Sequence, residues 1–455
     1  MCAVVGAILY PLRIAEAQAA QEILNFIWDH SHQRGRDGRG YVIQAPDGIR
    51  EDKETTHLPS IRPYLHVGDC LTRVSIIGNL RAEPTTEYVM DKNQDDQQPY
   101  RAGGWSIVHN GTVANDKELR TGEVPTKIDS AAIAELLASS KTKPVLSEFV
   151  KAIDQIKGSY AILALQEENQ SLFVAANYRP VWYIVTAVGT FLASSRHYFP
   201  PEYIPQMMQP YSAAEFGPAG PRSSQSLYSC SGANNWALVV CSGGLDSVVS
   251  AVYAQKVLRK EVELIHFEYG SRAEGPEVKA VQAIAKELGV NLKLFPLPVY
   301  SKGDSPLLDS DSKVAGGEEG AEFAHEWVPA RNLLLLSVAT AYAEAHGFGS
   351  IILGNNLEEA GAYPDNEQEF VERFNDMLPF AVGDGKRVEV LMPVGNLMKH
   401  EIVRLGLDLG APLHLTWSCY RAGEHHCGKC GPCFMRRTAF KINGTDEVIH
   451  YEDEL

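Results

Sequence analysis

The chain has 455 residues, of which 45% are hydrophobic and 22% are charged. At roughly 100 to 200 residues per domain, this length predicts two or three domains with cores of their own. The 57 acidic residues outnumber the 41 basic ones and leave a formal net charge of -16. Because such a charge repels phosphate backbones, we expect small-molecule or protein substrates rather than a nucleic acid.

The composition also restricts the compartment. No apolar stretch approaches the ~20 residues that a membrane span needs. The apolar start at residues 3–9 lacks the basic region and the cleavage site of a signal peptide. Four of the eight cysteines lie within residues 419–433, which favours metal ligation in a reducing compartment over a disulfide scaffold. We therefore expect a cytoplasmic protein with no membrane partner.

The first domain is expected at residues 1–215, where strand-like and helix-like patterns are interspersed. Apolar runs predict strands at residues 3–9, 74–77, 105–108, 160–165, 172–175, 181–185 and 191–193. Helical spacing of apolar residues occurs at 14–28, 130–137 and 145–156. This order predicts an αββα arrangement, with two sheets sandwiched between helices.

Cys2 is the first candidate catalytic residue. Removal of Met1 would expose a thiolate nucleophile next to a free α-amino group, whose pKa near ~8 suits a base. A buried, incidental cysteine is the alternative. Further along the chain, Arg81 can bind the α-carboxylate of glutamine as a fork, and Asp129 can hold its α-ammonium group. Asn110 and the N–H of Gly111 can form an oxyanion hole.

These residues stand in Gly78-Asn79-Leu80-Arg81, His109-Asn110-Gly111 and Ile128-Asp129-Ser130. Together with Cys2, the set resembles the class II glutamine amidotransferases of the N-terminal-nucleophile (Ntn) hydrolase fold. The resemblance covers roughly the first 200 residues. It implies that Cys2, Arg81, Asn110, Gly111 and Asp129 release ammonia from glutamine.

Residues 216–235 are rich in Gly, Pro and Ser and are predicted to be a linker. The second domain is then expected at residues 236–455. Strands are predicted at 236–240, 262–267, 292–295 and 350–353, and helices at 248–258, 278–288, 331–345, 370–378 and 399–409. Alternating strands and helices predict a parallel sheet covered on both faces, with its ligand site at the carboxyl ends of the strands.

The turn after the first of these strands carries a phosphate-loop pattern. It consists of Ser242, Gly243, Gly244, Leu245, Asp246 and Ser247. The glycines let the backbone approach a ligand, and the N–H groups at the helix start attract phosphate. Asp246 offers a carboxylate for Mg²⁺. The pattern lacks the Gly-Lys-Ser/Thr of a Walker loop and resembles the pyrophosphate loop of ATP pyrophosphatases, which cleave ATP to AMP and pyrophosphate. An ordinary strand-to-helix turn is the alternative.

A cysteine cluster follows near the C-terminus. Cys419, Cys427, Cys430 and Cys433 form the spacing C-x7-C-x2-C-x2-C. Four thiolates can close a tetrahedral Zn²⁺ site, and a closed site of this kind is structural rather than catalytic. Four unrelated buried cysteines are the alternative.

Several motifs of residues 236–440 resemble the QueC family of ATP-dependent 7-cyano-7-deazaguanine synthases. They are the phosphate loop, Phe267-Glu268-Tyr269-Gly270, Val328-Pro329-Ala330-Arg331-Asn332, Tyr363-Pro364-Asp365, Lys399-His400-Glu401, Thr416-Trp417-Ser418 and the four cysteines. The resemblance implies that the carboxylate of 7-carboxy-7-deazaguanine is adenylated and displaced by ammonia, and that the amide is then activated and dehydrated to the nitrile.

The same resemblance assigns roles within the second domain. Arg331 and Lys399 would stabilise negative charge on the α-phosphate. The candidate contacts to the substrate are Tyr269, Arg272, Asn332, Tyr363 and Asp365. With both halves present, the chain resembles fused amidotransferase–QueC (Gat-QueC) proteins, and QueC relatives commonly form homodimers.

Departures from the family pattern in two motifs leave the acceptor open. Ser271 and Ala273 stand where the family has Gln and His, and Asn366 stands where it has Cys. The same activation chemistry could join the deazaguanine to an amine on a partner protein of an antiviral system. It could also amidate deazaguanine in tRNA or DNA, which the net charge disfavours. A non-catalytic binding protein is the third alternative.

Overall fold

The computed structural model describes residues 2–452 except 36, 46–47, 56–60, 67–71, 83–92, 140–144, 169, 229–234, 315, 318–325, 361–362, 384–385, 422 and 448. The chain forms two compact units, residues 1–229 and 230–455. No helix in the described ranges is long and apolar enough to cross a membrane.

The first unit contains two antiparallel sheets. The seven-stranded sheet has the order β11-β9-β10-β1-β4-β2-β3 and the six-stranded sheet the order β13-β12-β8-β7-β6-β5. The strands of the first sheet are β1 (Ala3–Leu9), β2 (Gly38–Ala45), β3 (Gly48–Glu54), β4 (Val74–Arg81), β9 (Trp182–Thr186), β10 (Gly189–Ala193) and β11 (Gln206–Met207). Those of the second are β5 (Tyr100–Ala102), β6 (Trp105–Val113), β7 (Gly158–Gln166), β8 (Ser171–Ala176), β12 (Ser212–Gly217) and β13 (Gly220–Ser226).

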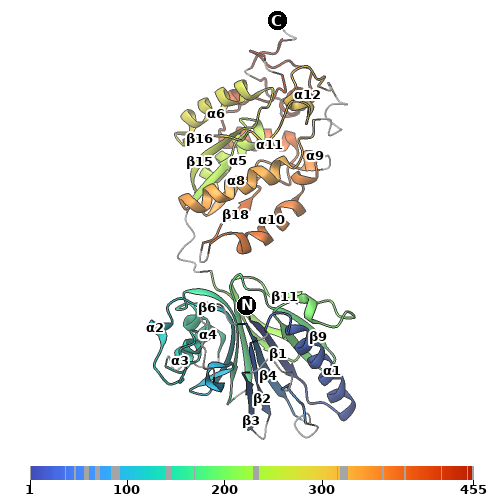
Figure 1. Cartoon of the computed structure of the whole chain (residues 1–455). Coiled ribbons are helices and arrows are strands. Elements are labelled where there is room, and N and C mark those ends of the chain that lie inside the picture. The colour runs from blue at the N-terminus through green and yellow to red at the C-terminus, as the bar shows by residue number, and fades with distance from the viewer. Residues whose placement is uncertain are drawn as a thin grey trace. The chain divides into compact units, whose positions relative to one another are not determined.

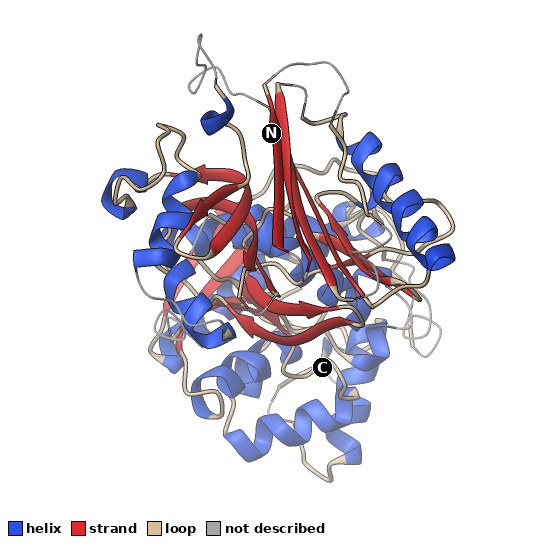
Figure 2. Ribbon diagram, turned by 90° about the horizontal axis from the view of Figure 1, so that it is seen from below, coloured by secondary structure: helices blue, strands red, loops and turns tan. Residues whose placement is uncertain are grey.

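Helices cover the outer face of each sheet (Figure 1). The helices are α1 (Ile14–Ser31), α2 (Asp116–Leu119), α3 (Ala131–Ser139) and α4 (Leu146–Ile153). α1 buries Leu24 and Trp28 against the seven-stranded sheet, because they lie on one face of the helix. α4 buries Phe149 against the six-stranded sheet. Val4 and Leu163 belong to the core between the two sheets. These layers confirm the predicted αββα sandwich, seen from another side in Figure 2.

The segment predicted as a linker begins with ordered structure. β12 and β13 form a hairpin whose turn connects Gly217 to Gly220, and β12 pairs with β8 of the six-stranded sheet. The structure therefore places residues 216–226 in the first unit. Gly and Pro are typical of a tight hairpin turn as well as of a linker, and the polar side chains of β13 are exposed because it is an edge strand.

The second unit contains a parallel sheet of the order β16-β15-β14-β17-β18. Its strands are β14 (Trp236–Val240), β15 (Glu261–Glu268), β16 (Asn291–Pro296), β17 (Ser350–Ile352) and β18 (Glu389–Leu391). α5 (Leu245–Lys256) and α6 (Glu274–Leu288) pack on one face, and α8 (Arg331–His346) and α10 (Gln368–Ala381) on the other. This confirms the predicted parallel sheet. α9 (Leu357–Ala360), α11 (Lys399–Leu409) and α12 (Gly431–Ile442) complete the unit, and α11 packs on both α5 and α12.

The order of the strands locates the ligand site of this unit. β14 is the first strand in the chain, and it pairs with β15 on one side and with β17 on the other. The chain therefore winds in opposite directions from β14, which opens a crevice between the carboxyl ends of β14 and β17.

Candidate active sites

The phosphate loop lies at this crevice, as predicted. It connects the end of β14 to the start of α5, and the Ser247 hydroxyl donates a hydrogen bond of 3.1 Å to the Gly244 carbonyl. Gly243 has φ +85°, a conformation that favours glycine. Gly354 follows β17, and a Cβ there would lie 2.7 Å from the Ser247 nitrogen. Glycine at residue 354 therefore lets the two strand ends come together.

A cavity of about 230 Å³ opens at the loop. Most of the predicted site residues of this unit line it: Ser242, Gly244, Leu245, Asp246, Ser247, Tyr269, Arg272, Arg331, Asn332, Tyr363 and Lys399. Asp365 lines a smaller adjoining hollow that shares Arg331 and Tyr363. Residues that are distant in sequence thus converge on one site at the carboxyl edge of the sheet.

Lys399 binds two carboxylates in this cavity. Its Nζ atom lies 2.6 Å from Oδ2 of Asp246 and 3.4 Å from Oε1 of Glu359. Burial disfavours the ammonium ion, but the two carboxylates outweigh this effect and raise the pKa of Lys399. Lys399 is therefore a fixed positive charge next to the phosphate loop. Glu359 is not among the site residues predicted from the sequence.

Asp246 suits a divalent cation. Its Oδ2 atom accepts hydrogen bonds from Lys399 and Asn356, whereas its buried Oδ1 atom has no hydrogen-bond partner among the described residues. A buried carboxylate oxygen without a donor is costly unless a ligand satisfies it. Mg²⁺ prefers carboxylate and phosphate oxygens. Asp246 therefore suits its predicted role as a magnesium ligand.

Arg331 begins α8 and lies within the cavity wall. Its Nη1 atom donates a hydrogen bond of 3.3 Å to the Tyr269 hydroxyl, and its guanidinium group lies 5.9 Å from the centre of that ring. Tyr269 therefore orients Arg331, and the two residues predicted for charge stabilisation and substrate contact are direct neighbours.

Three predicted substrate contacts are engaged in holding the walls of the cavity. Asp365 accepts a hydrogen bond of 3.0 Å from the Asn332 backbone N–H, and the Asn332 side chain donates to the Asp365 carbonyl and to Oδ1 of Asn366. Arg272 donates to the carbonyls of Asp309 at 3.2 Å and Ser312 at 2.8 Å. In this structure these three side chains stabilise the wall of the cavity through hydrogen bonds. Sequence motifs alone do not reveal this role.

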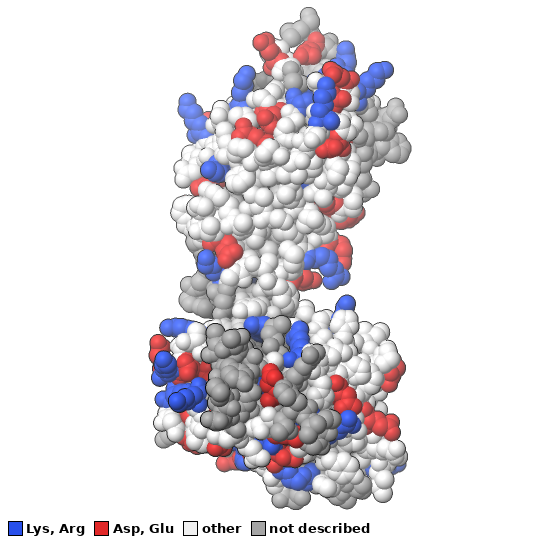
Figure 3. Space-filling view, in the orientation of Figure 1, with Lys and Arg blue, Asp and Glu red and all other residues white. Residues whose placement is uncertain are grey.

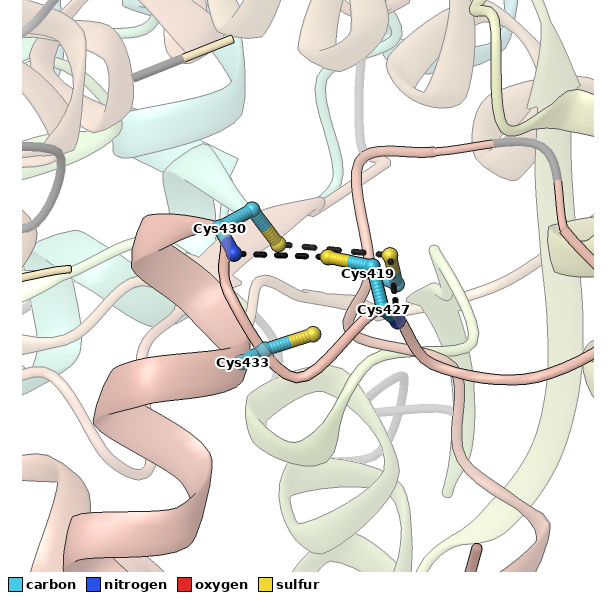
Figure 4. A group of neighbouring side chains, drawn as sticks. All are labelled: Cys419, Cys427, Cys430 and Cys433. Carbon is cyan, nitrogen blue, oxygen red and sulfur yellow. Dashed lines mark hydrogen bonds between the residues drawn. The ribbon is translucent and has the colours of Figure 1, made fainter. Parts of the chain in front are cut away.

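The four cysteines converge as predicted. Their sulfur atoms lie within 4.8 Å of one another and all four residues are buried (Figure 4). The Sγ atoms of Cys419 and Cys430 are 3.9 Å apart, close to the ~3.8 Å that tetrahedral bonds of ~2.3 Å to zinc require. Backbone N–H groups of Arg421 and Cys427 donate to the sulfur of Cys419, as they would to a thiolate. The cluster therefore fits Zn²⁺.

The cysteine-bearing segment contacts the phosphate loop directly. The backbone N–H of Trp417 donates a hydrogen bond of 2.8 Å to the carbonyl of Gly243. The fully buried Arg436 of α12 donates to Oγ1 of Thr416 at 2.6 Å and to the Leu413 carbonyl at 2.9 Å. A metal at the cysteines would therefore fix the segment that supports the loop.

In the first unit, Cys2 lies next to the end of β4. Ala3 pairs with Leu80, which places Cys2 beside Arg81, and the Cys2 sulfur is 3.7 Å from the Ala82 carbonyl oxygen. Tyr100 is a neighbour that sequence reasoning missed. Burial raises its pKa, and Arg81, Asp96, Cys2 and Asp129 all act on it electrostatically. The Tyr100 hydroxyl and the Arg81 guanidinium group both donate to the Asp96 carbonyl oxygen, so Tyr100 lies beside Arg81.

Asn110 and Gly111 lie on β6, opposite Ala161 and Tyr160 of β7. A Cβ atom on Gly111 would lie 1.8 Å from the Ser159 carbonyl oxygen, so a side chain there would clash with the backbone of β7. Glycine therefore permits the close strand contact that positions the N–H group of the predicted oxyanion hole.

Asp129 is held rigidly at this site. Its Oδ2 atom accepts a hydrogen bond of 2.6 Å from the Val113 N–H, and its Oδ1 atom accepts one of 3.0 Å from the Ser130 hydroxyl. Nδ1 of His109 lies 2.8 Å from the same hydroxyl. Burial lowers the pKa of His109, which keeps the ring neutral. His109 therefore supports Asp129 through Ser130.

Comparisons with known proteins find a matching family for each of the two units. Residues 236–444 match the family model of queuosine biosynthesis protein QueC, and residues 85–200 match that of a glutamine amidotransferase domain. The chain is 42% identical to the 7-cyano-7-deazaguanine synthase of Saccharolobus solfataricus, with 100% of both chains covered. The synthase of Methanothrix thermoacetophila is 42% identical over 48% of this chain and 98% of its own length.

Among solved structures, the glutamine phosphoribosylpyrophosphate amidotransferase from B. subtilis, complexed with ADP and GMP, is similar with a TM-score of 0.39 and 15% identity. The match covers 95% of this chain and 96% of that one. This similarity is too weak to decide the fold, which rests on the layers and strand orders described above.

Proposed function

The chain belongs to the QueC family of 7-cyano-7-deazaguanine synthases, and from this premise we propose that it makes the nitrile from 7-carboxy-7-deazaguanine with ATP and glutamine-derived ammonia. The carboxylate is adenylated in the second unit, ammonia converts the adenylate to the amide, and a second activation leads to the nitrile. The observation that carries the proposal is the phosphate loop with Lys399 bound to Asp246 in a cavity lined by Arg331.

Different residues of the cavity have different roles in the activation step. The N–H groups and hydroxyls of residues 242–247 bind the pyrophosphate that leaves ATP. Lys399 and Arg331 place two positive charges in the cavity, where negative charge develops on the α-phosphate. Because both side chains are already held by hydrogen bonds, they need little rearrangement during the reaction.

Two metal ions have separate roles in this proposal. Mg²⁺ held by Asp246 would neutralise phosphate charge when ATP is bound. Zn²⁺ held by Cys419, Cys427, Cys430 and Cys433 would have no open position and would stabilise the segment that contacts Gly243.

The first unit supplies ammonia. The Cys2 thiolate attacks the side-chain amide of glutamine, while Asn110 and the Gly111 N–H stabilise the oxyanion. Arg81 binds the α-carboxylate and Asp129 the α-ammonium group of the substrate. This assignment is supported by the position of Cys2 beside Arg81 at the end of β4 and by the hydrogen bonds that fix the Asp129 carboxylate.

The enzyme is further proposed to act as a cytoplasmic homodimer. Leu333 and Ala341 are exposed on α8, and Met377 and Phe380 are exposed on α10. The face of the second unit that carries α8 shows few charged groups (Figure 3). Two copies that pair through this face would bury these apolar side chains. Analytical ultracentrifugation that detects only single chains at micromolar concentration would contradict the pairing.

Mass spectrometry of the products tests the proposal. Purified protein is incubated with ATP, Mg²⁺, 7-carboxy-7-deazaguanine and either glutamine or ammonium chloride. We expect wild type to form the nitrile from both nitrogen sources, and Cys2→Ala to form it from ammonium only. If AMP forms without any new small molecule, the acceptor is a macromolecule, and a mass increase on a co-expressed protein would identify the conjugating alternative. Unchanged glutamine use by Cys2→Ala would contradict the role of the first unit.

A further inference from the structure

Glu277 lies in the first turns of α6 and lines the same cavity as the phosphate loop. Its Oε2 atom accepts a hydrogen bond of 3.0 Å from the Ser271 hydroxyl. In the described part of the chain, no residue donates a hydrogen bond to Oε1. Glu277 therefore offers a carboxylate oxygen to whatever occupies the cavity.

The other acidic side chains near Lys399 are engaged. Asp246 and Glu359 bind its ammonium group, and Glu358 accepts a hydrogen bond of 3.0 Å from its backbone N–H. No histidine occurs among the described residues that line the cavity. Ala273 lies one helical turn before Glu277 and lines the same cavity.

Three groups that line the cavity differ in how readily they exchange a proton near neutral pH. Lys399 keeps its proton because its pKa is raised, and burial raises the pKa of Tyr269 so that it stays neutral. Burial raises the pKa of Glu277 to about 7, although the hydrogen bond from Ser271 and the charge of Arg331 on α8 act in the opposite direction. Glu274, on the same helix, adds a smaller upward effect.

We propose that Glu277 is the proton acceptor in amide formation. The inference rests on the proposed synthase function and extends it to one proton transfer. The ammonia nitrogen forms a bond to the adenylated carboxyl carbon, and AMP leaves with the electron pair of the broken C–O bond. The nitrogen, which then carries a positive charge, transfers one proton to the Glu277 carboxylate. The products are the neutral amide, AMP and protonated Glu277, which returns its proton to solvent.

The test separates activation from amination in the full-length protein. Substrate-dependent ATP–pyrophosphate exchange without ammonia measures adenylate formation, and mass spectrometry after addition of ammonium chloride measures the amide. We expect Glu277→Gln to retain exchange but to form the amide at least ~100-fold more slowly, as the loss of a general base predicts. Glu287→Gln, which removes the same charge from an exposed position on α6, should leave both rates unchanged.

The pH dependence provides a second readout. At a constant concentration of free ammonia, amide formation should rise with pH around the pKa of Glu277. Ser271→Ala removes a hydrogen bond that lowers this pKa, so the rise should move to higher pH. A purely structural role for Glu277 would not produce this shift.

The outcomes are distinguishable. An amide rate in Glu277→Gln equal to wild type, with the same pH dependence, overturns the inference. Loss of exchange together with amide formation also overturns it, because Glu277 would then act in activation. If wild-type protein shows no exchange with 7-carboxy-7-deazaguanine, the proposed function itself fails and the inference fails with it.

Discussion

Lys399 is the residue on which the proposed activation step should depend most, because its one ammonium group pairs with both Asp246 and Glu359. We expect Lys399→Met to lower ATP–pyrophosphate exchange at least ~100-fold, the typical effect of removing one group that stabilises developing charge. The variant should also lose about 2 to 3 kcal/mol of unfolding free energy. This loss is smaller than that expected on breaking a fully buried ion pair, because the side chain of Glu359 is 37% exposed. Exchange assays and urea unfolding measure both effects. Lys279→Met, an exposed change on α6, is the control, and wild-type exchange in Lys399→Met would contradict the role.

Glu277 also predicts how stability depends on pH. Its pKa is about 7 in the folded protein and ~4.3 in an unfolded chain. The folded state therefore binds more protons between these values, and this group's contribution to stability is lost as pH rises through about 7. We expect Glu277→Gln to reduce the loss of unfolding free energy between pH 5 and pH 8 in the absence of ligands. An identical pH dependence in the variant and in wild type would contradict the raised pKa.

At the scale of elements, the cysteine cluster links α12 to the phosphate loop. Cys430 precedes α12, Cys433 lies within it, and Trp417 carries the contact to Gly243. We expect one zinc ion per chain by elemental analysis and its loss in Cys433→Ser, together with faster proteolysis of the C-terminal segment and weaker ATP binding. Cys2→Ala is the matched control and should keep its zinc. Full zinc occupancy in Cys433→Ser would show that these four cysteines do not form the site.

At the scale of the whole molecule, each unit has its own hydrophobic cores. Leu238 and Ile351 belong to a core of the second unit, whereas Val5 and Phe191 belong to a core of the first. We therefore expect a fragment of residues 230–455 to unfold cooperatively and to use ammonium but not glutamine. Calorimetry and the product assay measure these properties. A fragment that is folded but inactive with ammonium would show that the second unit requires the first for chemistry.

The strongest sequence patterns correctly predicted the main elements and the fold class. Apolar runs identified β1, β7 and β14 because nearly all of their side chains are buried, on both faces of the sheet, and helical spacing identified α1 and α11. β3 and β13 escaped prediction because they are edge strands with many exposed polar residues. β18 has only three residues, too few to show a period.

For the sites, local sequence motifs indicated which residues are candidates. The tertiary structure decided which of these residues lie in contact. Asp246 and Lys399 are separated by 153 positions, and they form a pair because α11 packs on α5. Three features left no signal in the sequence. Glu277 lines the cavity, Tyr100 interacts electrostatically with Cys2 and Arg81, and Arg272 holds a loop through hydrogen bonds. A motif reflects the local requirements of the backbone, whereas contacts between distant segments depend on strand order and helix packing.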